Sequence, residues 1–230
     1  MFKTSRILAL IPARGGSKGL PGKNIKDFLG DPLVARPIML AKKSDYIDKI
    51  VVSTDSHEIA KVAREYGSDV SMRPDDISGD TAVVADVVRY TLDELQKEGE
   101  TFDYVILLEA TSPMRDLDII NTCIEKLDDS NIDSVATFSV ADPPPTRIWK
   151  IEKDIASPFI EGADPWLPRQ KQVEGYYLNG LVYIFRVETF LHGSSNTLFV
   201  GNGAAVVTDV HCVDIDTLED FELAETLLGK

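Results

Sequence analysis

The chain has 230 residues, enough for one sizeable hydrophobic core but cramped for two full domains, so we expect a single domain over residues 1–230. Its apolar content of 43% and charged content of 27% are ordinary for a globular protein. The net charge of -14 argues against a general nucleic-acid binder, because a phosphate backbone demands a basic face.

Positive charge is concentrated at the beginning of the chain. Residues 1–43 hold nine Lys and Arg against two acidic residues, Asp27 and Asp31, which gives this segment +7 and leaves -21 for the rest. Such an asymmetry is typical of a protein that recruits a small polyanion to one place and keeps an acidic, solvated surface elsewhere.

The first predicted element is a buried strand over residues 6–11, a short apolar run that ends at Pro12 and a group of glycines. The apolar stretch 7–13 is too short to cross a bilayer, and no signal-peptide cleavage pattern follows the leading residues. We therefore expect a cytoplasmic protein that does not bind membranes.

A loop rich in glycine and cations, residues 11–24 with the sequence IPARGGSKGLPGKN, follows this strand. Arg14, Lys18 and Lys23 would repel one another unless an anion lay among them, and small residues let backbone N–H groups approach that anion. The loop is neither a P-loop, whose diagnostic positions here hold Ser and Asn, nor a Gly-x-Gly-x-x-Gly fingerprint. A di- or triphosphate site is the favoured interpretation, and a basic surface turn is the alternative.

Strands and helices alternate along the next hundred or so residues. We predict further strands at 49–53, 104–108 and 134–139, and helices at 31–43, 56–66, 81–97 and 117–127. Apolar strands that alternate with amphipathic helices predict an α/β fold, a parallel sheet with helices on both faces.

Three polar clusters directly follow predicted strands. They are the glycine-rich loop, Ser53-Thr54-Asp55, and the segment from Glu109 to Arg115. Because the carboxyl ends of parallel strands meet at one edge of a sheet, we expect these clusters to form the walls of one ligand pocket.

The alternation breaks at Ala141, where a proline-rich excursion runs to residue 171. About thirty residues are too many for an ordinary loop. Trp149, Phe159 and Trp166 indicate that the excursion buries apolar surface, either against a second subunit or against its own core. Strands over 181–185 and 210–215 and a helix over 217–228 are expected to complete the chain.

The glycine-rich loop resembles the signature loop of the CMP-N-acetylneuraminate synthetase (acylneuraminate cytidylyltransferase) family. Further motifs follow in that family's order over nearly the whole chain: Ser53-Thr54-Asp55, Arg73-Pro74, Asp80-Thr81, Thr111-Ser112-Pro113, Arg169-Gln170, Asn179-Gly180 and Asp214-Ile215-Asp216-Thr217. The resemblance implies a three-layer, Rossmann-like nucleotide-diphospho-sugar transferase fold with a mostly parallel sheet. It also implies a homodimer in which residues 141–171 form a small dimerisation lobe.

The activity implied by the resemblance is transfer of CMP from CTP to the anomeric hydroxyl of a 2-keto-3-deoxy acidic sugar, sialic acid or a related nonulosonate, with release of pyrophosphate. Charge builds on the phosphoryl oxygens, so catalysis consists mainly of positioning and electrostatic stabilisation. Lys23, with Arg14, is the candidate for stabilising the transition state. The implied CTP-binding residues are Arg14, Ser17, Lys23, Asn24, Arg73 on the cytosine side, and Thr81, for which a loop or helix-cap role is the alternative.

Asp214 and Asp216 are the candidate metal ligands. Two residues apart on the predicted last strand, they would fall on one face and share one hard cation, and the family uses these positions for Mg²⁺. Asp216 is also a candidate to assist deprotonation of the attacking hydroxyl. Its alternative role is to cap the last helix.

The resemblance places the acidic sugar among seven residues. Arg169 and Arg147 are candidates for its carboxylate, because a guanidinium fork matches that group. The remaining candidates are Asn179, Tyr183, Glu109, Thr111 and Gln170. Glu109 and Tyr177 depart from the usual Gln and basic residue of sialic-acid enzymes, which favours a modified nonulosonate or related keto sugar.

Three alternatives stay open at this point. They are a Kdo-type cytidylyltransferase, a nucleotidyltransferase that acts on sugar 1-phosphates, and a catalytically silent nucleotide-binding module. The presence of Arg14, Lys23, Asp214 and Asp216 argues against the silent module, which has no physical need for all of them.

Overall fold

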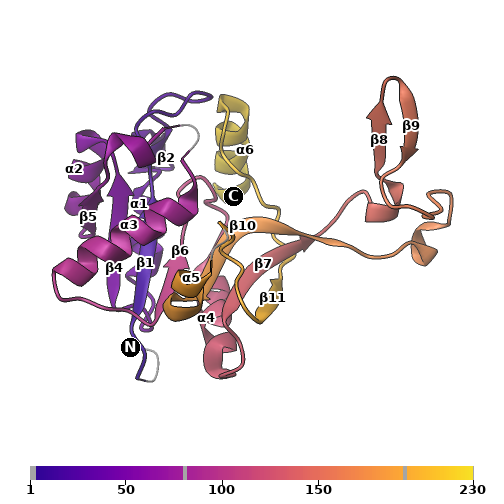
Figure 1. The fold of residues 1–230 in the computed structure, drawn as a ribbon. Coiled ribbons are helices and arrows are strands. Elements are labelled where there is room, and N and C mark those ends of the chain that lie inside the picture. Colours follow the sequence, from indigo (N-terminus) through magenta and orange to yellow (C-terminus); the bar gives the residue numbers. More distant parts are fainter. Residues whose placement is uncertain (1–3, 80–81, 194–195, 230) are drawn as a thin grey trace.

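A computed structural model describes residues 4–79, 82–193 and 196–229 (Figure 1). Its centre is a seven-stranded sheet in the order β11-β7-β10-β6-β1-β4-β5. Neighbouring strands are parallel except around β10, which is antiparallel to both β6 and β7. The strands are β1 (Ile7–Pro12), β4 (Lys49–Thr54), β5 (Asp69–Met72), β6 (Tyr104–Leu107), β7 (Ser134–Val140), β10 (Tyr176–Arg186) and β11 (Gly203–Val207).

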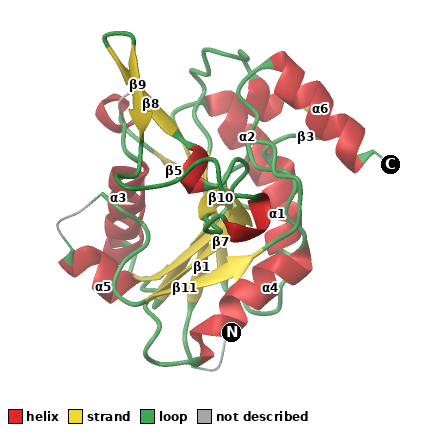
Figure 2. Ribbon diagram, turned by 90° about the vertical axis from the view of Figure 1, so that its right-hand side faces the viewer, coloured by secondary structure: helices red, strands yellow, loops and turns green. Residues whose placement is uncertain are grey.

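Helices cover both faces of the sheet, which confirms the three-layer α/β architecture (Figure 2). One face packs against α1 (Ala35–Ala41), α2 (His57–Glu65) and α4 (Leu117–Glu125), and the other against α3 (Val84–Lys97) and α5 (Val187–His192). The last helix, α6 (Leu218–Leu228), packs on a small hairpin of β2 (Asp27–Phe28) and β3 (Asp31–Pro32). None of the helices in these described ranges is long and apolar enough to span a membrane.

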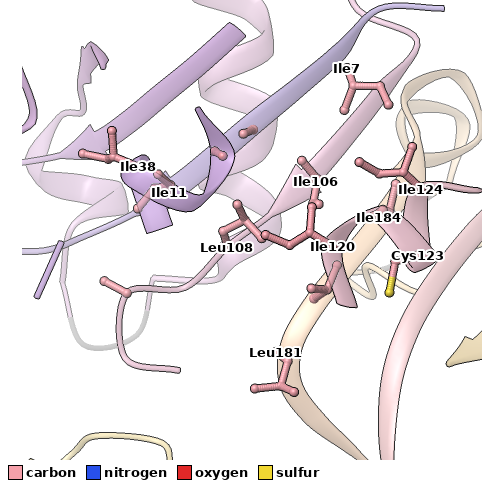
Figure 3. Close-up of a cluster of buried hydrophobic side chains, with 14 of the residues drawn as sticks. Ile7, Ile11, Ile38, Ile106, Leu108, Ile120, Cys123, Ile124, Leu181 and Ile184 are labelled. Atoms are coloured by element: carbon pink, nitrogen blue, oxygen red, sulfur yellow. The ribbon is translucent and has the colours of Figure 1, made fainter. Parts of the chain in front are cut away.

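The apolar strands supply the two halves of the core by alternation. In β1, Ile7 and Ile11 point into the cluster formed with α1, α2 and α4, whereas Leu8 and Leu10 point into the cluster formed with α3. Figure 3 shows the first cluster, where Ile11 lies near Ile38 and the side chains of α4 gather beside β6 and β10. A strand that is buried on both faces has a continuous run of apolar residues in its sequence. For this reason β1 and β6 were predictable from the sequence.

Two predicted elements differ from the structure. The helix expected from Asp31 begins at Ala35, because Leu29 and Gly30, both at positive φ, turn the chain into the β2–β3 hairpin. The strand expected over 210–215 is wrong, since this segment joins no sheet. The position beside β7 is occupied by β11 instead, and Val213 and Ile215 pack under α6.

The excursion is an arm that projects from β7 and β10 away from the body of the molecule (Figure 1). It carries a hairpin of β8 (Trp149–Glu152) and β9 (Ile155–Pro158), whose burial patterns are almost wholly exposed. The interpretation that it folds back on its own core is therefore wrong. The exposed apolar side chains between β7 and β10 are Ile148, Trp149, Ile151, Ile155, Phe159, Ile160, Trp166, Leu167 and Val173.

Candidate active site

A cavity of about 280 Å³ lies at the carboxyl end of β1. Here the strand order changes direction, with β4 and β5 on one side of β1 and β6 on the other, which is where ligands bind in such sheets. The predicted site residues in its lining are Arg14, Ser17, Lys23, Asn24, Arg73, Glu109, Thr111 and Asp216. A larger cavity of about 560 Å³, between α3 and the edge strand β5, contains none of the predicted site residues.

The glycine-rich loop is fixed by contacts to its neighbours. The Gly15 N–H donates to Asp55 Oδ1 at 2.8 Å, and Asn24 Nδ2 donates to the Arg14 carbonyl at 2.9 Å across the loop. Gly22, with φ of 71°, leads into a short 3-10 turn, η1 (Lys23–Ile25). Within the described chain the buried Asn24 Oδ1 has no hydrogen-bond partner, so it is an acceptor suited to a ligand donor.

Lys23 joins this loop to the segment before α6. Its Nζ donates to the Ile215 carbonyl at 2.6 Å and to Asp216 Oδ1 at 2.9 Å. Gly19 lies so close to the same segment that an added Cβ would be 2.3 Å from the Asp216 carbonyl oxygen. The two ends of the chain therefore form one wall of the cavity, as the paired motifs in the sequence indicate.

Arg73 lies at the β5 end of the cavity. Its backbone N–H donates to the Thr54 carbonyl at 3.0 Å. Burial lowers the pKa of its guanidinium, Asp55 opposes that shift, and Arg14 adds to it. In the described structure Arg73 Nε is buried without a hydrogen-bond partner. Arg73 and Arg14 thus bring two cations close together at a site that favours an anionic ligand.

Carboxylates gather at the β6 side of the cavity. Burial raises the pKa of Glu109, Asp214 raises it further, and Arg115 and Lys23 oppose the shift. Burial also raises the pKa of the Tyr183 hydroxyl, with Glu109 and Asp214 contributing. The charges of Glu109 and Asp214 thus act on the same region of the protein.

Asp214 and Asp216 share one side of the chain although they are not on a strand, because Val213 and Ile215 alternate with them and point into the core. No cluster of three or more potential metal ligands occurs among the described residues. Two carboxylates beside a cationic loop nevertheless fit Mg²⁺, which takes one or two carboxylates and completes its shell with water and substrate phosphates.

Helix α6 is capped by Thr217, not by Asp216. The Thr217 side chain accepts from the Asp220 N–H, and Asp220 Oδ2 in return accepts from Thr217 N–H at 2.8 Å and Asp216 N–H at 3.1 Å. Asp220 has no role in the sequence-based prediction, whereas Asp55 enters it only as part of the Ser53-Thr54-Asp55 cluster. The Thr-x-x-Asp capping pattern could have identified Asp220.

Five predicted sugar-binding residues are not part of the cavity lining: Arg147, Arg169, Gln170, Asn179 and Tyr183. The candidate metal ligand Asp214 is not part of it either. Arg147, Arg169 and Gln170 lie in the 3-10 turns of the arm, and Arg147 Nη2 donates to the Leu167 carbonyl at 3.1 Å. Asn179 is buried, and its Nδ2 donates to Ser139 Oγ at 3.0 Å and to Thr208 Oγ1 at 2.9 Å. The Asp80-Thr81 pair lies outside the described residues.

A mostly parallel sheet with a cationic, glycine-rich loop at its topological switch point defines an α/β protein of the nucleotide-binding class. Residues 8–152 match the protein-family model described as Cytidylyltransferase. The chain therefore belongs to the cytidylyltransferase family.

Related proteins match over nearly the whole chain. CMP-N,N'-diacetyllegionaminic acid synthase of Legionella pneumophila is 34% identical over 226 residues, 97% of this chain and 96% of the relative. Pseudaminic acid cytidylyltransferase of Campylobacter jejuni is 31% identical over 222 residues, 96% of this chain and 95% of the relative. N-acylneuraminate cytidylyltransferase of Streptococcus agalactiae is 32% identical over 217 residues, 93% of this chain but 51% of that longer relative.

Solved structures support the fold. A CMP:2-keto-3-deoxy-manno-octonic acid synthetase complexed with CTP superposes with a TM-score of 0.72 at 17% identity, covering 98% of this chain and 99% of that one. A 4-diphosphocytidyl-2C-methyl-D-erythritol synthase gives a TM-score of 0.68 at 13% identity, covering 98% and 100%.

Proposed function

We propose that this protein transfers CMP from CTP to the anomeric hydroxyl of a 2-keto-3-deoxy acidic sugar of the nonulosonate class. The observation that carries this proposal is that Arg14 and Lys23 of the glycine-rich loop line the same cavity as Asp216, with Lys23 bonded to Asp216. The relatives named for legionaminic, pseudaminic and N-acylneuraminic acid support the same acceptor class.

In the reaction, the anomeric oxygen forms a bond to the α-phosphorus of CTP while the bond from that phosphorus to the pyrophosphate oxygen breaks. Arg14 and Lys23 hold the triphosphate and offset the charge that grows on the leaving pyrophosphate. We assign nucleotide binding to Arg73 and to Asn24, whose Oδ1 has no partner within the described chain; both residues line the cavity. Ser17 lies with them in the lining, and Thr81 stays a prediction.

Asp214 and Asp216 are proposed to hold Mg²⁺, which when bound supplies Lewis-acid neutralisation of the phosphate oxygens. Asp216 Oδ1 is paired with Lys23 Nζ at 2.9 Å, and three quarters of the Asp216 side chain is exposed. A triphosphate that draws Lys23 away leaves Asp216 free to accept the proton of the attacking hydroxyl, directly or through water.

The exposed arm supports a homodimer. Its apolar side chains would be covered by a second copy, and Arg147, Arg169 and Gln170 would then reach the partner's cavity, where the sugar carboxylate needs a cation. A location in the cytoplasm stays a prediction, supported by the use of CTP as substrate.

Pyrophosphate release tests the proposal. Purified protein with CTP and Mg²⁺ is expected to release pyrophosphate with a nonulosonic acid from a panel of sialic, legionaminic, pseudaminic and Kdo-like acids. Lys23→Ala and Asp216→Ala should each lower kcat/KM by about a hundredfold or more while folding normally, because each removes a charge that acts on the transition state. Near-normal rates in both variants would contradict the assigned roles.

The same assay separates the alternatives. Turnover with a sugar 1-phosphate and with no keto acid would replace the proposal with another nucleotidyltransferase. Binding of CTP and Mg²⁺ in calorimetry, without turnover across the panel, would favour a silent nucleotide-binding module.

A further inference from the structure

Arg115 is a buried cation bonded to the backbone of Glu109, a residue of the cavity lining. Its side chain is 4% exposed. Its Nε donates to the Leu181 carbonyl at 2.5 Å, and its Nη2 donates to the Glu109 carbonyl at 2.7 Å. Throughout the described chain, no carboxylate forms an ion pair with it at 4.0 Å or closer.

A buried charge of this kind is expensive, and two carbonyl groups do not require one. A neutral donor would satisfy them without the desolvation cost of a guanidinium. Burial lowers the pKa of Arg115 to about 10, with Glu109, Asp214 and Cys212 opposing the shift, so the group stays charged at neutral pH. Its field therefore acts on two carboxylates of the active site, Glu109 and Asp214.

The two carbonyls belong to two different segments, of which only the Glu109 turn lines the cavity. Glu109 follows β6, whereas Leu181 lies in an irregular part of β10, where the pairing with β7 shifts between Leu178 and Tyr183. Gly180 has φ of 75° in this irregularity, and an added Cβ there would be 3.3 Å from Ser112 Oγ. Leu181 is fully buried in the core cluster that α4 covers, and its backbone carbonyl is the group that Arg115 holds.

We propose that Arg115 is a positioning residue for the acidic sugar, because one planar guanidinium holds the Glu109 turn and the β10 irregularity in a fixed relation. Through these contacts it sets the position of Glu109, which lines the cavity, relative to β10, the strand that carries Tyr183. Arg115 itself does not line the cavity. The identity of the acceptor rests on the proposed function, whereas the hydrogen bonds from Arg115 to the Glu109 and Leu181 carbonyls do not.

Steady-state kinetics of Arg115→Lys and Arg115→Met test this inference. Lysine keeps the charge but loses the planar fork, and methionine fills part of the volume without charge. Both should raise KM for the acidic sugar by about tenfold or more, because hydrogen bonds from a charged donor are lost, while KM for CTP changes less than about twofold. Arg64→Lys, an exposed arginine of α2, is the matched control and should leave both constants unchanged.

Hydrogen–deuterium exchange supplies a readout that needs no activity. In both Arg115 variants the segments 109–115 and 178–183 should exchange faster, whereas the glycine-rich loop should not. A variant that merely lost stability would yield less folded enzyme with unchanged KM values. Unchanged KM for the sugar together with unchanged exchange in folded Arg115→Met would overturn the proposal.

Failure of the proposed function would look different. If the wild-type enzyme used another acceptor, the same KM comparison would be made with that acceptor, and a rise confined to its KM would still support Arg115 as a positioning residue. If Arg115→Met failed to fold, Arg115→Lys would decide the question by the same two measurements.

Discussion

At the residue scale, the site depends on close approach between segments that are far apart in the sequence. Gly19 touches the backbone of Asp216, and Lys23 bonds both the Ile215 carbonyl and the Asp216 carboxylate. The loop that we propose binds phosphate and the segment that we propose binds Mg²⁺ thus lie against each other. A change in their separation displaces the cations relative to the carboxylates.

Gly19→Ala is predicted to reduce activity without unfolding the protein. The new Cβ would lie 2.3 Å from the Asp216 carbonyl oxygen, so the two segments must separate. We expect kcat/KM to fall by about tenfold or more, since small displacements of catalytic groups are costly. Gly16→Ala is the control, because its Cβ would meet nothing within 4 Å. Equal activities of the two variants would contradict the coupling of loop and segment.

At the element scale, helix α6 fixes the carboxylates through its first turn. Asp220 accepts hydrogen bonds from the N–H groups of Thr217 and Asp216, which lowers its pKa. The folded state therefore prefers the ionised carboxylate. This preference stabilises the protein above the pKa of about 3.9 that Asp has in unfolded chains and is lost as pH falls through the lower folded value.

Asp220→Asn is accordingly predicted to be less stable than the wild type at pH 7, and the difference should shrink as pH falls below about 4. Thermal denaturation between pH 7 and pH 3 measures it. Glu222→Gln, a neighbouring carboxylate on the same helix, should show no such trend. A stability difference that is independent of pH would contradict the role of the ionised cap.

The elements also show how far a sequence can be interpreted. Residues 7–12 and 104–107 are continuous apolar runs, and burial on both faces leaves no other environment for them. The missed strands β5 and β11 are short and carry Asp, Ser, Gly or Ala, so they give weak apolar signals at the sheet edges. The segment 210–215 resembles a strand because buried and exposed residues alternate over Val213, Asp214 and Ile215, but alternation does not show whether a neighbouring strand pairs with it.

The sequence allowed those site residues to be predicted that come directly after the end of a predicted strand. Strand ends placed the glycine-rich loop, Ser53 to Asp55 and Glu109 at one edge, and the structure brings all three together. Arg115 enters the sequence-based prediction only as the last residue of a pocket-wall segment, because nothing in a single sequence distinguishes a buried arginine from an exposed one. Its burial depends on β10 returning beside β6, a long-range pairing.

At the scale of the whole molecule, the body buries its apolar side chains in its own core, whereas the arm leaves apolar side chains exposed. Ile151 and Ile155 are 73% and 72% exposed at the far end of the arm. Trp149, Phe159 and Trp166 indicated buried apolar surface from the sequence, and a single copy of the chain exposes all three. A second copy is the cover that we propose.

Ile151→Asp combined with Ile155→Asp is predicted to convert a dimer into a monomer of unchanged fold, because it buries two charges in the proposed interface. Light scattering after size-exclusion chromatography measures the mass. Leu191→Asp, an exposed apolar residue on α5, should remain dimeric. A wild-type monomer, or a double variant that stays dimeric, would contradict the role of the arm.

The central claim is that CMP joins the anomeric oxygen of an acidic keto sugar. Phosphorus-31 NMR of the product made from CTP, Mg²⁺ and a nonulosonic acid tests it most directly. The account predicts one phosphodiester resonance in the nucleotide product, with pyrophosphate in equal amount. A product with two coupled diphosphate resonances, formed only from a sugar 1-phosphate, would contradict it.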